Sequence, residues 1–296
     1  LWVNSRGGSE PMDRLNKRIA HFSAAPVLIL LVAFFVAPLL VIGIYSIMPQ
    51  KSFSLLAVPD FSSYNAIFVQ GYLKSLFWSL VLAFSSTVLL FLLCWPLAYA
   101  MAKVFNRFSL IITIAVVVSL FVSENIRLFG WLLTLMKGGL IEGMLRHYTG
   151  VGFEGALYNV PIIIFGLVYV YFPFMLFPLM QGIAMIPEDT RQAAFDLGAT
   201  RWQVLREIEL PLATPGIVVG TLLSFVLAAG ALAESKLLGG QTVIVLADDI
   251  ETAFTYGQNW PLGSALSMLL IMIIATIAVF GISRVDIDTI MGRKQS

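Results

Sequence analysis

The sequence contains few charged residues and hardly any cysteine or histidine. Asp, Glu, Lys and Arg make up 12% of its 296 residues, about half the share found in soluble domains. The single Cys94 excludes a disulfide framework within the chain, and we expect it to be a small core residue. A formal net charge of +1, with basic residues spread along the chain, gives no indication of nucleic-acid binding.

Motifs of nucleotide-binding and metal-binding enzymes are also absent. No Gly-x-x-x-x-Gly-Lys-Ser/Thr sequence occurs, so the chain is not expected to hold ATP phosphates. His21 and His147 are the only histidines, and they form no His-Glu-x-x-His zinc motif. We therefore expect no catalytic residue, no metal site and no cofactor bound by this chain.

Hydrophobic residues, in contrast, make up 59% of the chain, and its mean hydropathy is +0.90. A helix needs about 20 apolar residues to cross a bilayer. Six runs reach or nearly reach this length: 24–47, 73–101, 110–136, 160–183, 216–237 and 262–283. The third is interrupted by Ser123-Glu-Asn-Ile-Arg127, so a span followed by a short outer helix is an alternative there. The pattern predicts an all-α integral membrane protein with six transmembrane helices.

Lysines and arginines indicate the orientation of these spans. They gather before the first run, between the second and third, within residues 187–211 and after the sixth. Because short cytoplasmic connections retain basic residues, both termini and residues 187–211 are expected in the cytoplasm. We expect one transmembrane domain, 24–283, between cytoplasmic tails 1–23 and 284–296, with no cleavable signal peptide.

Residues 187–211 form a polar island between two apolar runs, and they carry signals for two short helices. Pro187 suits the first turn of a helix. Gly198 is a natural helix C-cap, and Thr200 followed by Gln203 forms a capping-box pattern. A helix-turn-helix elbow is therefore predicted.

The second helix of this elbow is expected to have one apolar stripe. Trp202, Leu205 and Ile208 recur every third residue, as positions on one helical face do. We expect Pro211 and Pro215 to end the helix.

The same residues resemble a known family motif. Gln192-Ala193-Ala194, three residues, Gly198, nine residues and Ile208-x-Leu210-Pro211 are similar to the EAA loop of membrane-spanning subunits of bacterial ATP-binding-cassette importers. Gln192 stands where the family usually has Glu, so hydrogen bonding is kept but the charge is lost. The resemblance implies a type I importer permease fold. It also implies a coupling role for Gln192, Ala193, Ala194, Asp196, Gly198, Ile208, Leu210 and Pro211. An ordinary amphipathic elbow between spans is the alternative.

The resemblance further implies an assembly in the bacterial inner membrane. Its partners would be two ATPase subunits that hold ATP and magnesium, a second similar permease and an external substrate-binding protein. Glu124 to Trp131, Leu238 to Gly240 and Asn259 to Ala265 resemble the polyamine, or spermidine/putrescine, branch of these permeases. Related branches carry ferric iron, phosphonates or opines. A secondary transporter is a rival, but the two halves lack the matching features of an inverted repeat.

Ionisable residues in or near spans are costly, so they are candidates for a substrate pathway. Glu124 and Arg127 are three residues apart and share a helix face, where they either form a structural ion pair or line the pathway. Glu234 either faces the pathway or lies past the membrane edge.

Aromatic residues in the fourth run extend this candidate set. Tyr169 and Tyr171 lie just before Pro173, and a helix interrupted by proline can border a translocation cavity. Core packing is the alternative for each tyrosine. The expected pathway residues are therefore Glu124, Arg127, Tyr169, Tyr171 and Glu234.

Overall fold

The computed structural model describes residues 26–54, 58–150 and 156–283, and these ranges are mostly helical. No strand occurs within them, which confirms the all-α fold class. Five helices are long and apolar enough to cross a membrane, or six if one bent pair forms a single span. The expected tails, 1–23 and 284–296, lie outside the described residues.

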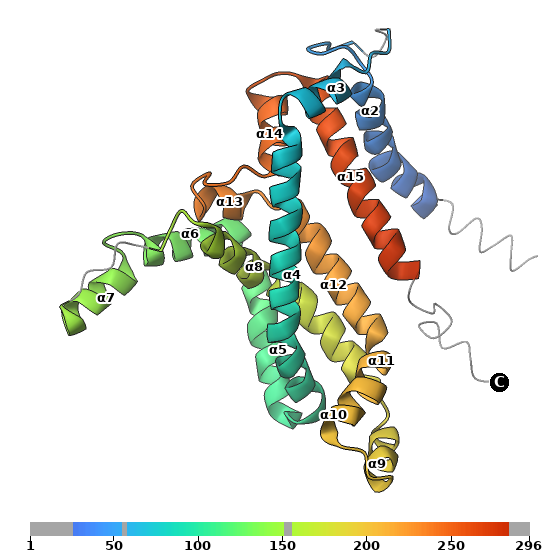
Figure 1. Ribbon diagram of the computed structural model, residues 1–296, viewed down its shortest axis with the longest axis vertical. Coiled ribbons are helices and arrows are strands. Elements are labelled where there is room, and N and C mark those ends of the chain that lie inside the picture. The colour runs from blue at the N-terminus through green and yellow to red at the C-terminus, as the bar shows by residue number, and fades with distance from the viewer. Residues whose placement is uncertain (1–25, 55–57, 151–155, 284–296) are drawn as a thin grey trace, which may run out of the picture.

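Three helices form the centre of the molecule: α4 (Tyr72–Lys103), α8 (Val160–Ala184) and α12 (Thr214–Ala229), which pack against one another (Figure 1). Two glycines bring the backbones of α8 and α12 together. A Cβ added at Gly216 would lie 2.4 Å from the carbonyl oxygen of Pro178, and one at Gly182 would lie 2.9 Å from the Cα of Gly216. Small residues allow this close approach, which stabilises helix pairs in membranes through van der Waals contact.

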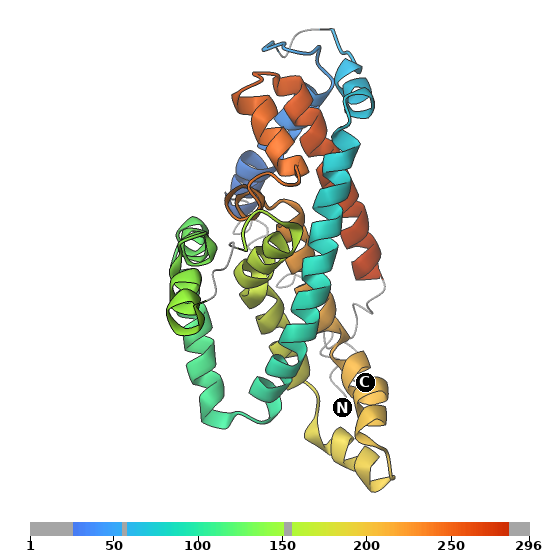
Figure 2. The ribbon, with the colours of Figure 1, turned by 60° about the vertical axis from the view of Figure 1, so that its left-hand side comes forward.

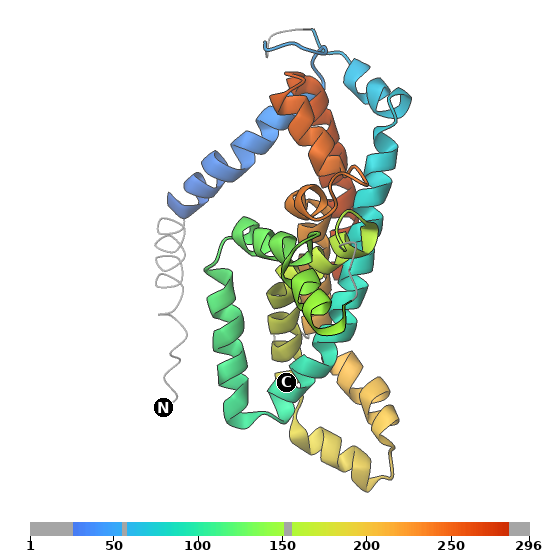
Figure 3. The same ribbon diagram turned by 90° about the vertical axis from the view of Figure 1, so that its left-hand side faces the viewer.

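A second group of helices lies toward the end of the molecule opposite the α9–α11 elbow (Figure 1). Here α15 (Trp260–Ser283) packs against α14 (Leu246–Thr255), α3 (Ser62–Val69) and α2 (Ala37–Ser46). The helix that contains α2 and the π-helical turn η1 (Val32–Val36) diverges from the body, as Figure 3 shows. Its side chains are largely exposed within this chain, which fits contact with lipid or with another subunit.

The third expected span is not one helix. Residues 110–136 divide into α5 (Asn106–Leu120) and α6 (Glu124–Leu135), because Ser123 has an extended backbone (ψ 139°) and Glu124 begins a new helix. Figure 2 shows that α5 turns back from the end of α4 and leads to α6 and α7 (Leu140–Thr149). The stretch long enough to span here runs from Glu124 to Tyr148. The alternative of a span followed by a short outer helix is met only in part, because the run does divide at this point but α5, with 15 residues, is shorter than a span.

The fifth expected span, 216–237, is also shorter than predicted. Helix α12 ends at Ala229, Gly230 follows as its C-cap, and α13 (Ala233–Leu237) is a separate short helix. At 1.5 Å per residue, a 16-residue helix extends only about 24 Å. It reaches spanning length only together with the preceding helical segment, from which it is bent by 68°.

Candidate functional site

The predicted elbow is present, and Gly198 forms its corner. Helix α9 (Glu188–Asp196) ends in a double hydrogen-bonded cap, in which the Gly198 N–H donates to Phe195 O (2.9 Å) and the Ala199 N–H donates to Ala194 O (3.0 Å). Gly198 has φ +85°, and an added Cβ would meet no atom within 4 Å. The position therefore favours glycine because its backbone is left-handed, and not because space for a Cβ is lacking.

The second arm of the elbow begins with the predicted capping box. The Thr200 N–H donates to the side-chain oxygen of Gln203 (2.8 Å), and the Gln203 N–H donates to the Thr200 hydroxyl (3.4 Å). From there the chain is helical through α10 (Arg201–Gln203), the π-helical η2 (Val204–Glu209) and α11 (Leu210–Leu212). Both caps that the sequence predicted are thus confirmed.

The predicted apolar stripe on this arm is wrong. Trp202 is 67% exposed, whereas Val204 and Glu209 are the buried residues. A π-helix bonds residues five apart, so Val204 and Glu209 share a face that a 3.6-residue period does not predict. Pro211 does not end the helix either, because it lies in the first turn of α11 and the chain bends at Ala213.

The residues assigned to coupling by resemblance lie along the projecting elbow (Figure 1). The exposed ones are Gln192, Ala193, Asp196, Gly198 and Pro211, and the half-buried ones are Ala194, Ile208 and Leu210. Phe195, Leu197 and Trp202 add exposed apolar side chains, with Leu197 at 89%. An exposed apolar surface bordered by polar residues is typical of a protein-binding site.

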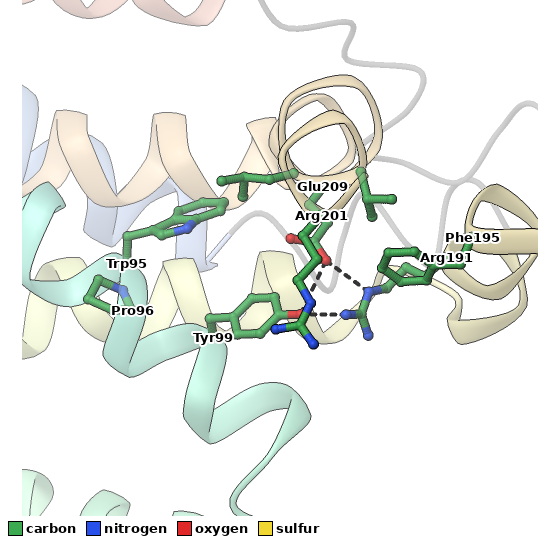
Figure 4. Close-up of a pocket in the computed structure, with 9 residues that line it drawn as sticks. Trp95, Pro96, Tyr99, Arg191, Phe195, Arg201 and Glu209 are labelled. Atoms are coloured by element: carbon green, nitrogen blue, oxygen red, sulfur yellow. Dashed lines mark hydrogen bonds and ion pairs between the residues drawn. The ribbon is translucent and has the colours of Figure 1, made fainter. Parts of the chain in front are cut away.

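A buried ion pair joins the two arms of the elbow. The Arg191 Nε donates to Glu209 Oε1 at 2.8 Å, and Arg191 also pairs with Glu188 at 2.9 Å. Glu209 is only 4% exposed. Figure 4 shows Arg191, Glu209 and Tyr99 of α4 turned toward one another around a cavity of about 530 Å³.

The end of α4 holds this elbow in place. The Tyr99 hydroxyl accepts a hydrogen bond from Arg191 and donates one to Glu209 (3.3 Å), and the Arg191 guanidinium lies 5.6 Å from the centre of the Tyr99 ring. One turn further, Lys103 Nζ donates to Ile186 O at 2.7 Å. Sequence reasoning missed Tyr99 and Glu209 and treated Lys103 only as an orientation signal. Pairing across roughly 90 residues leaves no local pattern that could have indicated it.

The second candidate region surrounds Glu234, in the first turn of α13. Glu234 is fully buried, and neither carboxylate oxygen has a hydrogen-bond partner of normal geometry among the described residues. The Tyr171 hydroxyl lies close to this carboxylate. Gly166 provides room for it, because a Cβ there would lie 3.3 Å from Glu234 Cγ and 2.7 Å from Leu238 Cδ1.

The other expected pathway residues lie around the same carboxylate. The Arg127 guanidinium lies 5.7 Å from the centre of the Tyr169 ring, and the charges of Glu124 and Arg127 both act on Glu234. No ion pair joins Glu124 to Arg127 in the part of the chain that the structure describes, and Arg127 Nε is buried without a hydrogen-bond partner. The five residues are thus brought together, but the expected ion pair is not formed.

Lys236, two residues after Glu234, is not part of this cluster. It pairs instead with Asp248 (3.1 Å) and Glu251 of α14. Cys94 is buried in the core as a free thiol, which confirms its expected role.

Comparisons with known proteins agree with this architecture. Residues 91–285 match the family described as binding-protein-dependent transport system inner membrane component. The chain is 29% identical over 266 residues to the spermidine/putrescine transport system permease protein PotB of Haemophilus influenzae, covering 89% of this chain and 93% of that protein. For PotB of Escherichia coli the identity is 28% over 240 residues, and the match covers 81% of this chain and 87% of that protein. Both are transport components rather than enzymes.

A solved structure has the same fold. It is a bacterial alginate ABC transporter in complex with an alginate pentasaccharide-bound periplasmic protein, with a TM-score of 0.73 at 19% sequence identity, covering 91% of this chain and 94% of that one. The family match covers well over half of the sequence. The chain therefore belongs to the binding-protein-dependent transport system inner membrane components, as a multi-pass permease subunit of an ATP-binding-cassette importer.

Proposed function

We propose that this permease conducts a polyamine, or a related linear amine, delivered by an external binding protein. The observation that carries the proposal is the buried Glu234 carboxylate, which has the Tyr171 hydroxyl nearby but forms no ion pair with a basic side chain among the described residues. A buried charge without a partner is costly, and a cation that enters the site would compensate it. The names of the two PotB relatives support the same class of substrate.

The aromatic residues beside Glu234 suit an amine. Ammonium and guanidinium groups bind over aromatic rings, and the Arg127 guanidinium already occupies this position over Tyr169. A substrate ammonium group can use the same ring and the nearby Tyr171. Two carboxylates, Glu124 and Glu234, disfavour anions such as phosphonates. Ferric iron or an opine remains the alternative cargo that uptake measurements would reveal.

The elbow is proposed as the surface that docks the ATPase. Its rigid caps, its exposed apolar residues and its attachment to α4 through Tyr99 and Arg191 support this role. The complete importer would contain two ATPase subunits and a second permease, with domain 24–283 of this chain in the membrane. Both termini and the elbow would then lie in the cytoplasm.

ATP-driven uptake of labelled putrescine and spermidine tests the substrate. The measurement uses liposomes that contain the complete transporter and its binding protein. Glu234→Gln, which keeps the shape of the side chain, should lower polyamine uptake roughly tenfold. The control Glu142→Gln, on the exposed α7, should retain it. The proposal would be contradicted if the unaltered transporter imported a different solute and no polyamine.

A further inference from the structure

A second cavity of about 450 Å³ lies between the first turns of α4 and the segment from Gln241 to Asp249. Figure 1 places these elements toward the end of the molecule opposite the elbow. Tyr72 and Trp78 of α4 contribute aromatic rings to its wall, and Asp249 of α14 contributes a carboxylate. The cavity is separate from the one beneath the elbow and shares no lining residue with it.

Hydrogen bonds from three elements hold the walls of this cavity. The Leu246 N–H donates to the Ser79 hydroxyl at 2.8 Å, which fastens the start of α14 to α4. The Thr242 hydroxyl donates to Tyr158 O at 2.9 Å, and the Ser235 hydroxyl donates to Val243 O at 3.0 Å. A cavity with fixed walls binds a ligand with little further ordering cost.

The chemistry of the lining favours a cation. Asp249 Oδ2 is buried without a hydrogen-bond partner among the described residues, although the Ser75 hydroxyl lies close to the carboxylate. Burial raises the pKa of Asp249, the nearby charge of Asp248 also raises it, and Ser75 lowers it. Its neighbour Asp248 is already paired with Lys236 at 3.1 Å, so Asp249 is the carboxylate open to a ligand.

Lys74 also lines the cavity, and its positive charge would repel a bound cation. Its side chain is exposed, and it forms no ion pair with the part of the chain that the structure describes. A positive charge at this position would weaken the binding of an amine, so removing it has an effect of the opposite sign to removing Asp249. A purely structural role of these two residues would not produce opposite changes in amine uptake, so the two variants together test the site.

The cavity also adjoins the proposed pathway. Val243 belongs to its wall and accepts the hydrogen bond from Ser235, the residue after Glu234. This link therefore joins the regions of two carboxylates that form no ion pair among the described residues, Asp249 in the cavity and Glu234 in the first turn of α13. A linear amine that leaves the cavity would meet the second carboxylate next.

We propose that this cavity binds the ammonium end of a linear amine between Asp249 and the rings of Tyr72 and Trp78, before the amine reaches Glu234. The proposal rests on the proposed function of amine transport. It adds an outer binding step that recognises one ammonium end of the amine.

Uptake of two related amines by the complete transporter in liposomes tests this step. The amines are labelled putrescine and mono-N-acetylputrescine, which has one positive charge fewer, both supplied with the binding protein below saturation. Asp249→Asn should lower the uptake of both amines roughly tenfold, because each of them has an ammonium end that the cavity can bind. Lys74→Gln should raise putrescine uptake, and the exposed control Asp60→Asn should leave both unchanged.

No loss of uptake in Asp249→Asn, or a loss there without a gain in Lys74→Gln, would overturn the inference. A loss of uptake that is fully explained by weaker docking of the binding protein would assign the cavity to protein contact and overturn it as well. If the unaltered transporter imports amines and the Asp249→Asn variant imports them equally well, this inference alone is rejected. Failure of the unaltered transporter to import any amine rejects the proposed function and this inference together.

Discussion

At the scale of single residues, two buried glutamates of this chain have opposite surroundings. Glu209 receives hydrogen bonds from Arg191 and Tyr99, so its charge is compensated within the chain. Glu234 is buried just as deeply, yet within the ranges that the structure describes no arginine or lysine pairs with it. A compensated carboxylate fixes structure, whereas an uncompensated one is available to a ligand. This contrast underlies the different roles proposed for the two residues.

The Arg191–Glu209 pair leads to a prediction at this scale. Arg191→Gln leaves the Glu209 charge buried and unpaired, so the complex should lose roughly 3 kcal/mol of stability or more. The double variant Arg191→Gln/Glu209→Gln should recover part of this loss, because neither charge then remains. Thermal unfolding of the purified complex measures the stability, and ATP-driven uptake measures transmission through the elbow. Additive losses in the double variant would show that the two residues do not act as a pair.

At the scale of elements, local chemistry explains where helices begin and end, but not how they continue. The caps at Gly198 and Thr200 depend on residues within one turn, so their pattern is visible in the sequence. The π-helical η2, in contrast, shows no such pattern in the sequence, and its Glu209 is joined to α4 by the hydrogen bond from Tyr99. The break at Gly230 likewise places Glu234 at the start of a separate helix, next to Gly166 of α8.

Gly198 leads to a prediction for the elbow. Gly198→Val should cost roughly 1–2 kcal/mol locally, since a β-branched residue is strained at φ +85°. The spans should still insert, but docking of the ATPase and uptake should fall. Gly198→Asn is the matched control, because asparagine adopts the left-handed conformation more readily. Co-purification of the ATPase with each variant measures docking, and normal docking and uptake by Gly198→Val would make the elbow an ordinary connector.

At the scale of the whole molecule, the elbow and the α3–α14 region lie at opposite ends of the central helices (Figure 1). The central helices pack through glycine contacts between α8 and α12, while the Pro26–Ser46 helix contacts the body through α15 and leaves most of its side chains exposed. A polar elbow at one end and a polar cavity near the other are the arrangement that a permease needs. In the proposed function, ATPase subunits would dock on the elbow side of the membrane, and the binding protein would act on the other side.

This arrangement leads to a prediction of topology. In a background without Cys94, a cysteine at Ser52 and a cysteine at Thr200 should react with a membrane-impermeant thiol reagent from opposite sides. Both hydroxyl side chains lie in connections, so the changes leave the spans intact. Ser52→Cys is expected to react in intact cells and Thr200→Cys only after the cells are opened. Reaction of both from the same side would refute the orientation inferred from the basic residues.

The sequence by itself determined the all-α membrane class, the two caps of the elbow and the family, because each depends on composition or on short fixed spacings. It also singled out Glu124, Arg127, Tyr169, Tyr171 and Glu234 one by one, since charge and proline in apolar runs are visible without a fold. Only the tertiary structure decided that Glu124, Arg127 and Tyr171 lie near Glu234 while Tyr169 lies beside Arg127. It also decided that Arg191 reaches Glu209 and Tyr99, and that Asp249 lines a cavity with Trp78. Such contacts join helices far apart in the chain, and their geometry depends on how glycine contacts, helix breaks and the π-helical turn set one helix against another.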